Sequence, residues 1–156
     1  MSSGFIANPN PPPPSTNVAG DGFWPEIDIA QLRNAVRVNG EVPEHRWYAI
    51  VVAAVIAVTD ELAGWKREQT AAGHATLADV PDIEIAGARR LKTLYLRAVS
   101  CAALAEVSER YRSYDATNSG SQRADELTPS IDECRRDLRW AIRDFLGQPR
   151  ATVELI

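Results

Sequence analysis

Apolar residues concentrate in one segment, Trp47 to Trp65, which reads WYAIVVAAVIAVTDELAGW and is the most apolar run of the chain. One face of this run follows the four-then-three spacing of an α-helix, and its members are Val51, Val55, Val58, Leu62 and Trp65. The pattern predicts a central core helix from about Pro43 to about Thr70. Its fully apolar part is shorter than the roughly 20 residues that a bilayer requires, so we expect a buried helix and no membrane span.

Two further helices are predicted on either side of this segment. A short helix is expected from Ile29 to Val38, with Asp28 as its N-terminal cap. A long helix is expected from Ala86 to Ser113, and the small residues on its apolar side predict close packing against the central helix. The predicted core positions of this long helix are Leu91, Leu94, Ala98 and Cys101.

The last helix has a heptad-like apolar stripe that includes Leu138, Ile142 and Phe145. Pro129 lies inside the pattern, so either the helix begins near Thr128 or a longer helix from about Gln122 kinks at the proline. Gly147 and Pro149 end it. The combined pattern predicts an all-α fold, a small helical bundle of three long helices plus a short N-terminal helix, with extended N- and C-terminal arms.

Proline and small polar residues set the expected domain boundaries. Residues 1–22 are predicted to be a Pro-rich flexible N-terminal arm, residues 23–147 the helical bundle domain, and residues 148–156 an extended C-terminal arm. The N-terminal arm is either a tail without contacts or a segment that docks on a neighbour through Phe5 and Ile6. Phe23 and Trp24 are expected to anchor the chain on the core before the first helix.

Composition describes an ordinary globular chain. The 156 residues are 45% hydrophobic and 24% charged, which fits one domain. A net charge of −4 argues against a general nucleic-acid binder, because such proteins need a basic surface. Cys101 and Cys134 lie on apolar sides of helical patterns, so we expect them to be buried and reduced, as in a cytoplasmic protein.

Residues with catalytic or metal-binding chemistry are scattered. His45 and His74 are isolated, and the two cysteines are on separate predicted helices, which disfavours a metal site. The chain contains none of the Gly-rich phosphate-binding, nucleophile-elbow or zinc-protease strings. We therefore predict no enzyme, no cofactor and no metal.

Two groups of basic residues are candidates for contacts with partners. The last helix carries five arginines, among them Arg135, Arg136, Arg139 and Arg143, against six acids. This mixture indicates either a solvated face with local ion pairs or a face that pairs with the next subunit. The start of the long helix carries Arg89, Arg90, Lys92 and Arg97, where the helix dipole disfavours positive charge. That second group indicates either an acidic partner or DNA, or local pairing with Asp82 and Glu84.

Several sequence blocks follow one another in a distinctive order. They are DGFWP (21–25), ELAGW (61–65), AGHATLADVP (72–81), SERYRSYDAT (108–117), RRDLRWAIRDFLG (135–147) and TVELI (152–156). From Asp21 to Ile156 this order resembles the GPL-type head completion/stabilisation protein family of tailed bacteriophages with contractile tails. The Pro-rich leader lies outside the resemblance.

The resemblance implies a structural virion protein, made in the bacterial host cytoplasm and located at the head–tail junction. Such a protein is expected to bind the portal protein after DNA packaging, to surround the channel as a dodecameric ring, and to present a surface to a neck or tail-terminator protein. The expected portal- or neighbour-binding arm is Arg150, Thr152, Val153, Glu154, Leu155 and Ile156. The alternatives are a plug that contacts packaged DNA in the portal channel, and a non-viral helical regulatory protein.

Overall fold

The computed structural model describes residues 17–36, 42–111 and 130–150. Its helices are α1 (Ile29–Ala35), α2 (Glu44–Glu61), α3 (Ala63–Ala71), α4 (Arg90–Tyr111) and α6 (Ile131–Phe145). Two short antiparallel pairs accompany them, β1 (Asn17–Val18) with β2 (Ile27–Asp28), and β3 (Glu84–Ile85) with β4 (Ala88–Arg89). The prediction of a small, mostly helical fold is confirmed.

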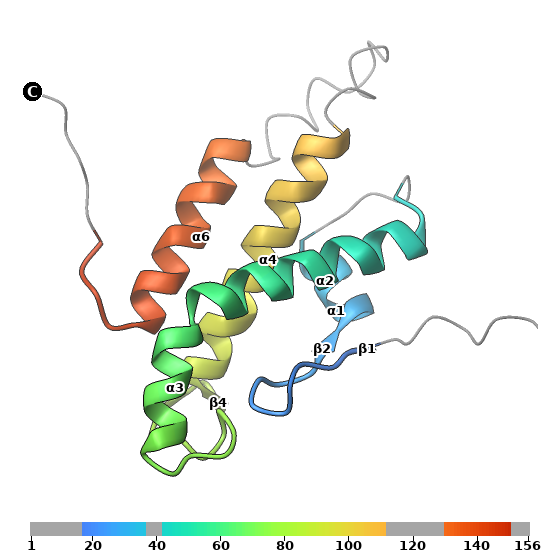
Figure 1. The fold of residues 1–156 in the computed structure, drawn as a ribbon. Helices are drawn as coiled ribbons and strands as arrows, with labels where there is room; N and C mark the ends of the chain where they lie inside the picture. The colour runs from blue at the N-terminus through green and yellow to red at the C-terminus, as the bar shows by residue number, and fades with distance from the viewer. Residues whose placement is uncertain (1–16, 37–41, 112–129, 151–156) are drawn as a thin grey trace, which may run out of the picture.

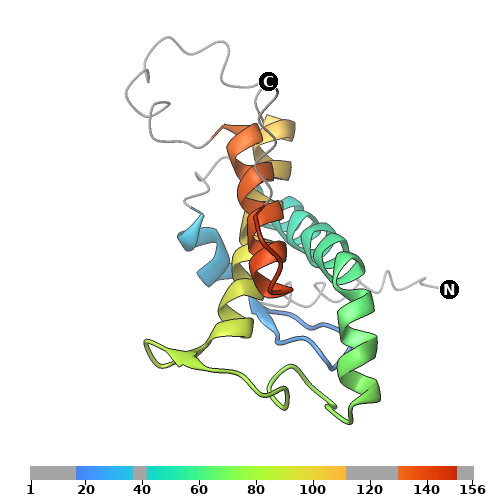
Figure 2. The ribbon, with the colours of Figure 1, turned by 90° about the vertical axis from the view of Figure 1, so that its left-hand side faces the viewer.

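Helix α4 is the centre of the arrangement. It lies alongside α6 over much of its length, and α2 packs across it (Figure 1). Helix α3 continues from the end of α2 and turns downward (Figure 1), and Figure 2 shows the N-terminal strands between α3 and the start of α4. The two faces of α4 are therefore covered by different helices.

The central apolar helix is broken, so the prediction of one helix from Pro43 to Thr70 is wrong. Helices α2 and α3 meet at a bend of 61°, with the fully buried Leu62 at the corner. Gly64 follows the corner, and glycine weakens a helix by about 1 kcal/mol relative to alanine. The bend lets the Trp65 ring pack against Phe145, with centroids 4.7 Å apart. The break between α2 and α3 is thus accompanied by packing of Trp65 against Phe145.

The long helix also starts later than predicted, at Arg90 instead of Ala86. Ala86 and Gly87 form the turn of the β3–β4 hairpin, with φ values of 53° and 76°. Positive φ at both central residues is the conformation of a type I′ turn, which is common in two-residue hairpin loops. Asp82 then caps α4, because its Oδ2 accepts a hydrogen bond from the Leu91 amide at 2.6 Å.

The N-terminal part of the folded body begins earlier than predicted. Strands β1 and β2 pair, and Val18 and Ile27 are buried by that pairing. The arm predicted for residues 1–22 is therefore too long at its C-terminal end, because an apolar residue at position 18 finds a place on the core. Residues 1–16 lie outside the described part of the chain, and so do Phe5 and Ile6.

Asp28 caps α1, as predicted, since its Oδ1 accepts a hydrogen bond from the Gln31 amide at 2.8 Å. The helix ends at Ala35, short of the predicted Val38, and residues 37–41 are not among those described. The Trp47 indole donates a buried hydrogen bond of 3.1 Å to the Ile29 carbonyl. This bond ties α1 to α2.

Helix α6 begins with a capping box at Ser130. The Ser130 hydroxyl accepts from the Glu133 amide at 3.2 Å, and the Glu133 carboxylate accepts from the Ser130 amide at 2.8 Å. Hydrogen bonding of its carboxylate by Ser130, chiefly by the backbone amide, holds the pKa of Glu133 below its usual value. The alternatives predicted for this start, near Thr128 or Gln122, fall on residues outside the described ranges. The helix ends as predicted, with Gly147 in the left-handed region at φ 67°.

The predicted core positions lie in or against one apolar core. The buried ones are Val51, Val55, Val58, Leu62, Leu91, Ala98, Ile142 and Phe145. The partly buried ones are Trp65, Leu94, Cys101 and Leu138. Cys134 is buried, Cys101 is half-buried, and both are free thiols.

Among the described helices, none is by itself both long and apolar enough to cross a membrane. Helices α2 and α3 reach that length and composition only as a pair, with the 61° bend between them.

Candidate assembly interface

A cluster of aromatic rings joins the N-terminal loop to α3, α4 and α6. Trp24 stacks on Tyr95 with centroids 4.8 Å apart and planes 8° from parallel, and it lies 6.0 Å from Phe145. Phe23 meets Trp24 edge-on at 5.1 Å, and Trp65 lies 6.3 Å from Trp24. Burial raises the pKa of Tyr95 well above its usual value, so its hydroxyl stays neutral. The cluster anchors the N-terminal loop on the core, as the sequence predicts.

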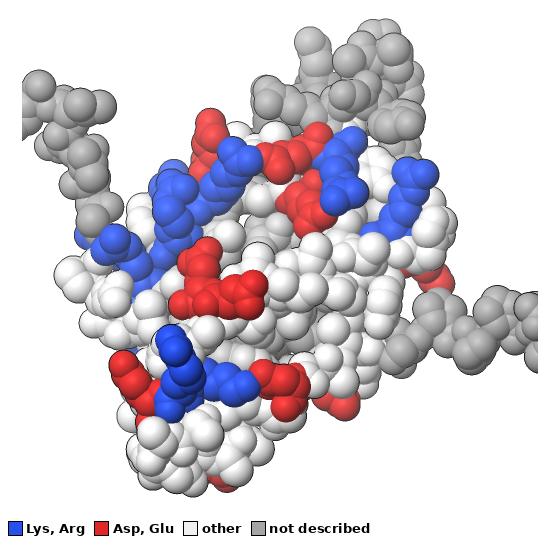
Figure 3. All heavy atoms as spheres, in the orientation of Figure 1, with Lys and Arg blue, Asp and Glu red and all other residues white. Residues whose placement is uncertain are grey.

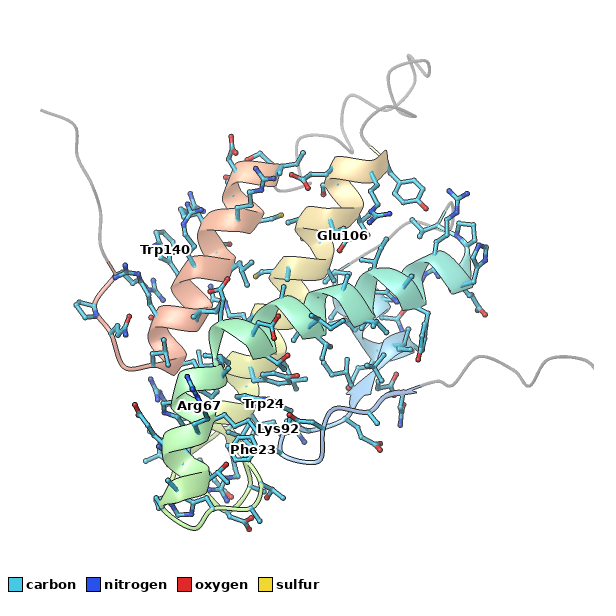
Figure 4. The ribbon with its side chains drawn as sticks, viewed as in Figure 1. Phe23, Trp24, Arg67, Lys92, Glu106 and Trp140 are labelled. Atoms are coloured by element: carbon cyan, nitrogen blue, oxygen red, sulfur yellow. The ribbon has the colours of Figure 1, made fainter. Side chains whose placement is uncertain are left out.

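A hollow of about 310 Å³ adjoins this cluster. It lies between the loop of Phe23 and Trp24, the turn Thr76–Ala78 and the start of α4. Lys92 lines it and reaches the same region as the two aromatic side chains (Figure 4).

The basic group predicted at the start of α4 is not one surface cluster. Arg89 donates a hydrogen bond of 2.5 Å to the Val80 carbonyl, and Arg90 donates one of 2.7 Å to the Asp144 carbonyl. Both guanidinium groups therefore tie chain segments together. Lys92 and Arg97 are exposed. Asp82 was one of the acids predicted to pair with these cations. Its carboxylate instead accepts a hydrogen bond from the Leu91 amide and caps the N-terminus of α4.

The charged face of α6 is occupied by local contacts. Arg135 forms an ion pair with Glu109 of α4, and Arg136 pairs with the adjacent Asp137 at 3.1 Å. Arg139 is exposed. Figure 3 shows these basic side chains following α6 and meeting acidic ones at its N-terminal end. The local ion-pair interpretation thus accounts for Arg135 and Arg136.

Trp140 lies on the outer side of α6, between two guanidinium groups (Figure 4). The Arg136 group is 4.7 Å and the Arg150 group 4.9 Å from the centre of its ring, which are cation–π distances. Arg150 also binds the Asp144 carboxylate through Nε at 3.0 Å and Nη2 at 2.5 Å. These hydrogen bonds hold the pKa of Asp144 below its usual range. We call Arg136, Trp140, Asp144 and Arg150 the tryptophan clamp.

The tryptophan clamp fixes where the C-terminal arm leaves the body. Gly147 reverses the chain after α6, and the Arg143 side chain donates a hydrogen bond of 2.9 Å to the Pro149 carbonyl. Arg150 is thereby held against α6, and it is the last residue of the described chain. The other predicted arm residues, Thr152 to Ile156, lie beyond it. The sequence analysis missed Trp140, although its spacing of four from Arg136 places both side chains on one helix face.

A second hollow, of about 350 Å³, opens between α2, α4 and α6. Its apolar walls are Ala54 and Ala57 of α2, Ala102 and Ala105 of α4, and Leu138 of α6. The small residues that predicted close packing thus leave a groove at this end. Two ion pairs border it, Glu106 with Arg110 and Glu109 with Arg135. We call this hollow the α2/α4/α6 groove.

Within the described ranges, no group of three or more His, Cys, Asp and Glu residues could hold a metal ion. Burial raises the pKa of both Cys101 and Cys134. Since the thiolate is the nucleophilic form, this shift makes both cysteines poor nucleophiles.

Comparison with known proteins identifies the family. The profile of the phage head completion protein (GPL) family matches residues 18–156. The chain belongs to this family. A curated relative, the head completion/stabilization protein of Escherichia phage P2, is 33% identical over 153 residues, covering 98% of this chain and 90% of the relative. No solved structure matches the chain significantly.

Membership in the GPL family confirms the resemblance found in the sequence. It identifies a structural, virion-associated phage protein with a role in completing the head. The match begins at Val18, which is the first buried residue of the described ranges.

Proposed function

We propose that this protein completes the head at the portal vertex, as a head-to-tail adaptor. After DNA packaging it adds to the portal protein as a ring of copies, stabilises the filled head, and presents a surface to the neck or tail-terminator protein. The observation that carries this proposal is the tryptophan clamp, which holds the exit of the C-terminal arm at a defined point on α6.

The arm has the properties of a segment that binds in extended form. Its sequence ATVELI alternates small or polar residues with Val153, Leu155 and Ile156, and it is too short to bury these side chains alone. Fully extended, residues 151–156 span about 20 Å. An arm whose first residue is held in place loses less conformational entropy on docking than an arm whose first residue is free to move. We therefore assign Thr152 to Ile156 the contact with the portal protein.

Docking of such an arm depends on the receiving surface. Ordering an extended segment costs conformational entropy, which only the contacts with a partner can offset. A portal ring presents many identical receiving sites side by side, so bound copies are held at a high effective concentration at which contacts between neighbours form more readily. Assembly is then limited to heads that have a portal.

The alternative of a DNA-contacting plug has weaker support. Arg89 and Arg90 already bind backbone carbonyls, which leaves Lys92 and Arg97 as the exposed members of the predicted group. Two exposed cations are few for phosphate binding, and the whole chain has a net charge of −4.

The decisive experiment removes the arm and keeps the tryptophan clamp. A variant that lacks residues 151–156 should lose binding to purified portal rings in co-sedimentation, while its helical circular dichroism stays unchanged. The matched control lacks residues 1–16, which are outside the family match, and should bind portal rings as well as the full chain. Portal binding that survives removal of residues 151–156 would contradict the assignment.

The plug alternative has its own test. Replacing Lys92 and Arg97 by Gln should leave DNA retention in filled heads unchanged, because the adaptor role does not require them. The control replaces Arg46 and Arg67, which are exposed cations on α2 and α3. DNA leakage with the first pair and not with the second would favour the plug.

A further inference from the structure

The outward side of α2 carries no charged residue over most of its length. From Trp47 to Thr59 the sequence of this helix contains no Asp, Glu, Lys or Arg. One side of the helix packs on the core, yet Ile56 is 55% exposed, and Ala49 and Ala57 are also exposed. Figure 3, which faces this side, shows an uncharged band along α2. An apolar helix face of this length on the surface is typical of a site that another chain covers.

One stripe of this face has opposite charges at its two ends. It follows the three-then-four spacing that lines one side of a helix, and its members are Arg46, Ala49, Ala53, Ile56 and Asp60. Four of them are exposed, and Ala53 is half-buried. Within the described ranges, the ion pairs involve neither Arg46 nor Asp60. Both charges are therefore available to a partner.

The stripe is complementary to itself when two copies of α2 run antiparallel. With Ala53 of each copy at a two-fold axis, Arg46 of one copy lies level with Asp60 of the other, because these residues stand equally far from position 53. The pairing then has one arginine–aspartate pair at each end. Between the ends, Ile56 of one copy lies beside Ala49 of the other, whose small side chain leaves room for it.

The charges also decide the direction of the pairing. A parallel arrangement of two α2 helices would place Arg46 beside Arg46 and Asp60 beside Asp60, and juxtaposed like charges oppose association. The antiparallel arrangement removes both repulsions. The small Ala53 side chain at the axis lets the two helices approach closely.

We propose that two copies of the free protein form a two-fold dimer through antiparallel pairing of their α2 helices. The partner is a second copy because one stripe supplies both members of each ion pair. A two-fold contact closes with two copies and builds no ring by itself, so the dimer is a state of the free protein. The inference goes beyond the proposed portal contact and does not depend on it, since α2 and the C-terminal arm are different parts of the chain.

The test exchanges the two charges one at a time in the full-length chain. With Arg46→Asp both ion-pair positions are acidic, and with Asp60→Arg both are basic, so the dissociation constant of the dimer should rise about tenfold or more in each variant alone. An equal mixture should dimerise like the unchanged chain, because each variant supplies the charge that the other has lost. Sedimentation at high protein concentration measures the masses, since a contact of one helix from each copy is a small interface.

The controls for this test are structural and electrostatic. Arg46 and Asp60 are exposed, so both variants should keep the helical circular dichroism of the unchanged chain. Arg67→Asp changes an exposed cation on α3, outside the stripe, and should leave the dimer unchanged.

A second measurement locates the two-fold axis. Ala53→Cys should form a disulfide with the same position of the second copy under mild oxidation. Ala49→Cys is the matched control, because its two copies would stand about 12 Å apart along the helix pair, beyond the reach of a disulfide. The unchanged chain controls for the native thiols, Cys101 and Cys134.

Three results would overturn the inference: an unchanged chain that stays monomeric at every concentration, a dimer that Arg46→Asp does not weaken, or crosslinking of Ala49→Cys as strong as that of Ala53→Cys. The portal contact is tested separately. A chain that lacks residues 151–156 should still dimerise, and the Arg46→Asp chain should still bind portal rings, so failure of one assignment leaves the other intact.

Discussion

The two halves of α4 are packed in different ways. Its N-terminal half meets large side chains, since Tyr95 stacks on Trp24 and the same cluster includes Trp65 and Phe145. Its C-terminal half carries Ala102 and Ala105, which face a groove. One end of the molecule is therefore filled by its own aromatic rings, and the other end has a groove that none of the described residues fills.

This difference in packing predicts a difference in stability between the two ends. Buried aromatic rings contribute large apolar areas, so the filled end supplies much of the free energy of folding. Alanine walls contribute little, and residues placed in the groove affect mainly what binds there. Substitutions should therefore lower the free energy of unfolding much more at the filled end than at the open end.

The largest expected effect is at the filled end. Trp24→Ala removes a buried ring that contacts three other elements, and should lower the free energy of unfolding by about 3–5 kcal/mol. Chemical denaturation measures it. The matched substitution at the open end is Ala57→Trp, which should change the free energy of unfolding by less than about 0.5 kcal/mol. Equal losses from both substitutions would remove the distinction between the two ends.

The next effect concerns the outer side of α6. Arg150→Ala removes both the stacking on Trp140 and the bonds to Asp144, so the arm loses its fixed exit. Portal affinity should fall by about tenfold, and stability by less than about 1 kcal/mol because the contacts are exposed. Titration of labelled protein against portal rings measures the affinity. Arg139→Ala is the control. A similar loss of portal affinity with Arg139→Ala would mean that the affinity depends on the charge of α6 and not on the tryptophan clamp.

A smaller effect is expected at the start of α6. Ser130→Ala removes the hydroxyl that accepts a hydrogen bond from the Glu133 amide, so the free energy of unfolding should fall by about 1 kcal/mol. Thermal denaturation checks the loss. Ser130→Asp keeps an acceptor at the cap and should restore most of the stability; a Ser130→Ala chain as stable as the unchanged one would disprove the capping role.

The smallest effect is a dependence on pH in the tryptophan clamp. The pKa of Asp144 is held below its ordinary value of 3.8 mainly by the Arg150 hydrogen bond. Its contribution to stability is therefore present above pH 3.8 and is lost as the pH falls through the lower folded pKa. The carboxyl chemical shift of Asp144 should titrate with a midpoint below 3.8, and Arg150→Ala should raise that midpoint. A midpoint unchanged by Arg150→Ala would contradict the coupling.

The sequence predicted the helical class, the family and most core positions, because these depend on periodic patterns and on blocks of several residues. It did not predict the bend at Leu62. The apolar spacing continues across that residue into Trp65, and the bend accompanies a tertiary contact of the Trp65 ring with Phe145. Gly64 was the one local signal for a weak point in the helix.

The candidate contact residues were harder to predict. Arg89 and Arg90 appear in the sequence as free basic residues, but their partners are carbonyls of Val80 and Asp144, the latter far along the chain. The β3–β4 hairpin was not predicted either. The left-handed conformation of Ala86 has no sequence signal beyond the following Gly87. Contacts between distant segments decide both cases.

The central claim is that the chain completes the head by adding to the portal. The most direct test is the native mass of purified portal rings, measured before and after mixing with the full-length protein. The account predicts an increase that corresponds to one copy of this chain for each portal subunit. A portal mass that stays unchanged at saturating protein would contradict it.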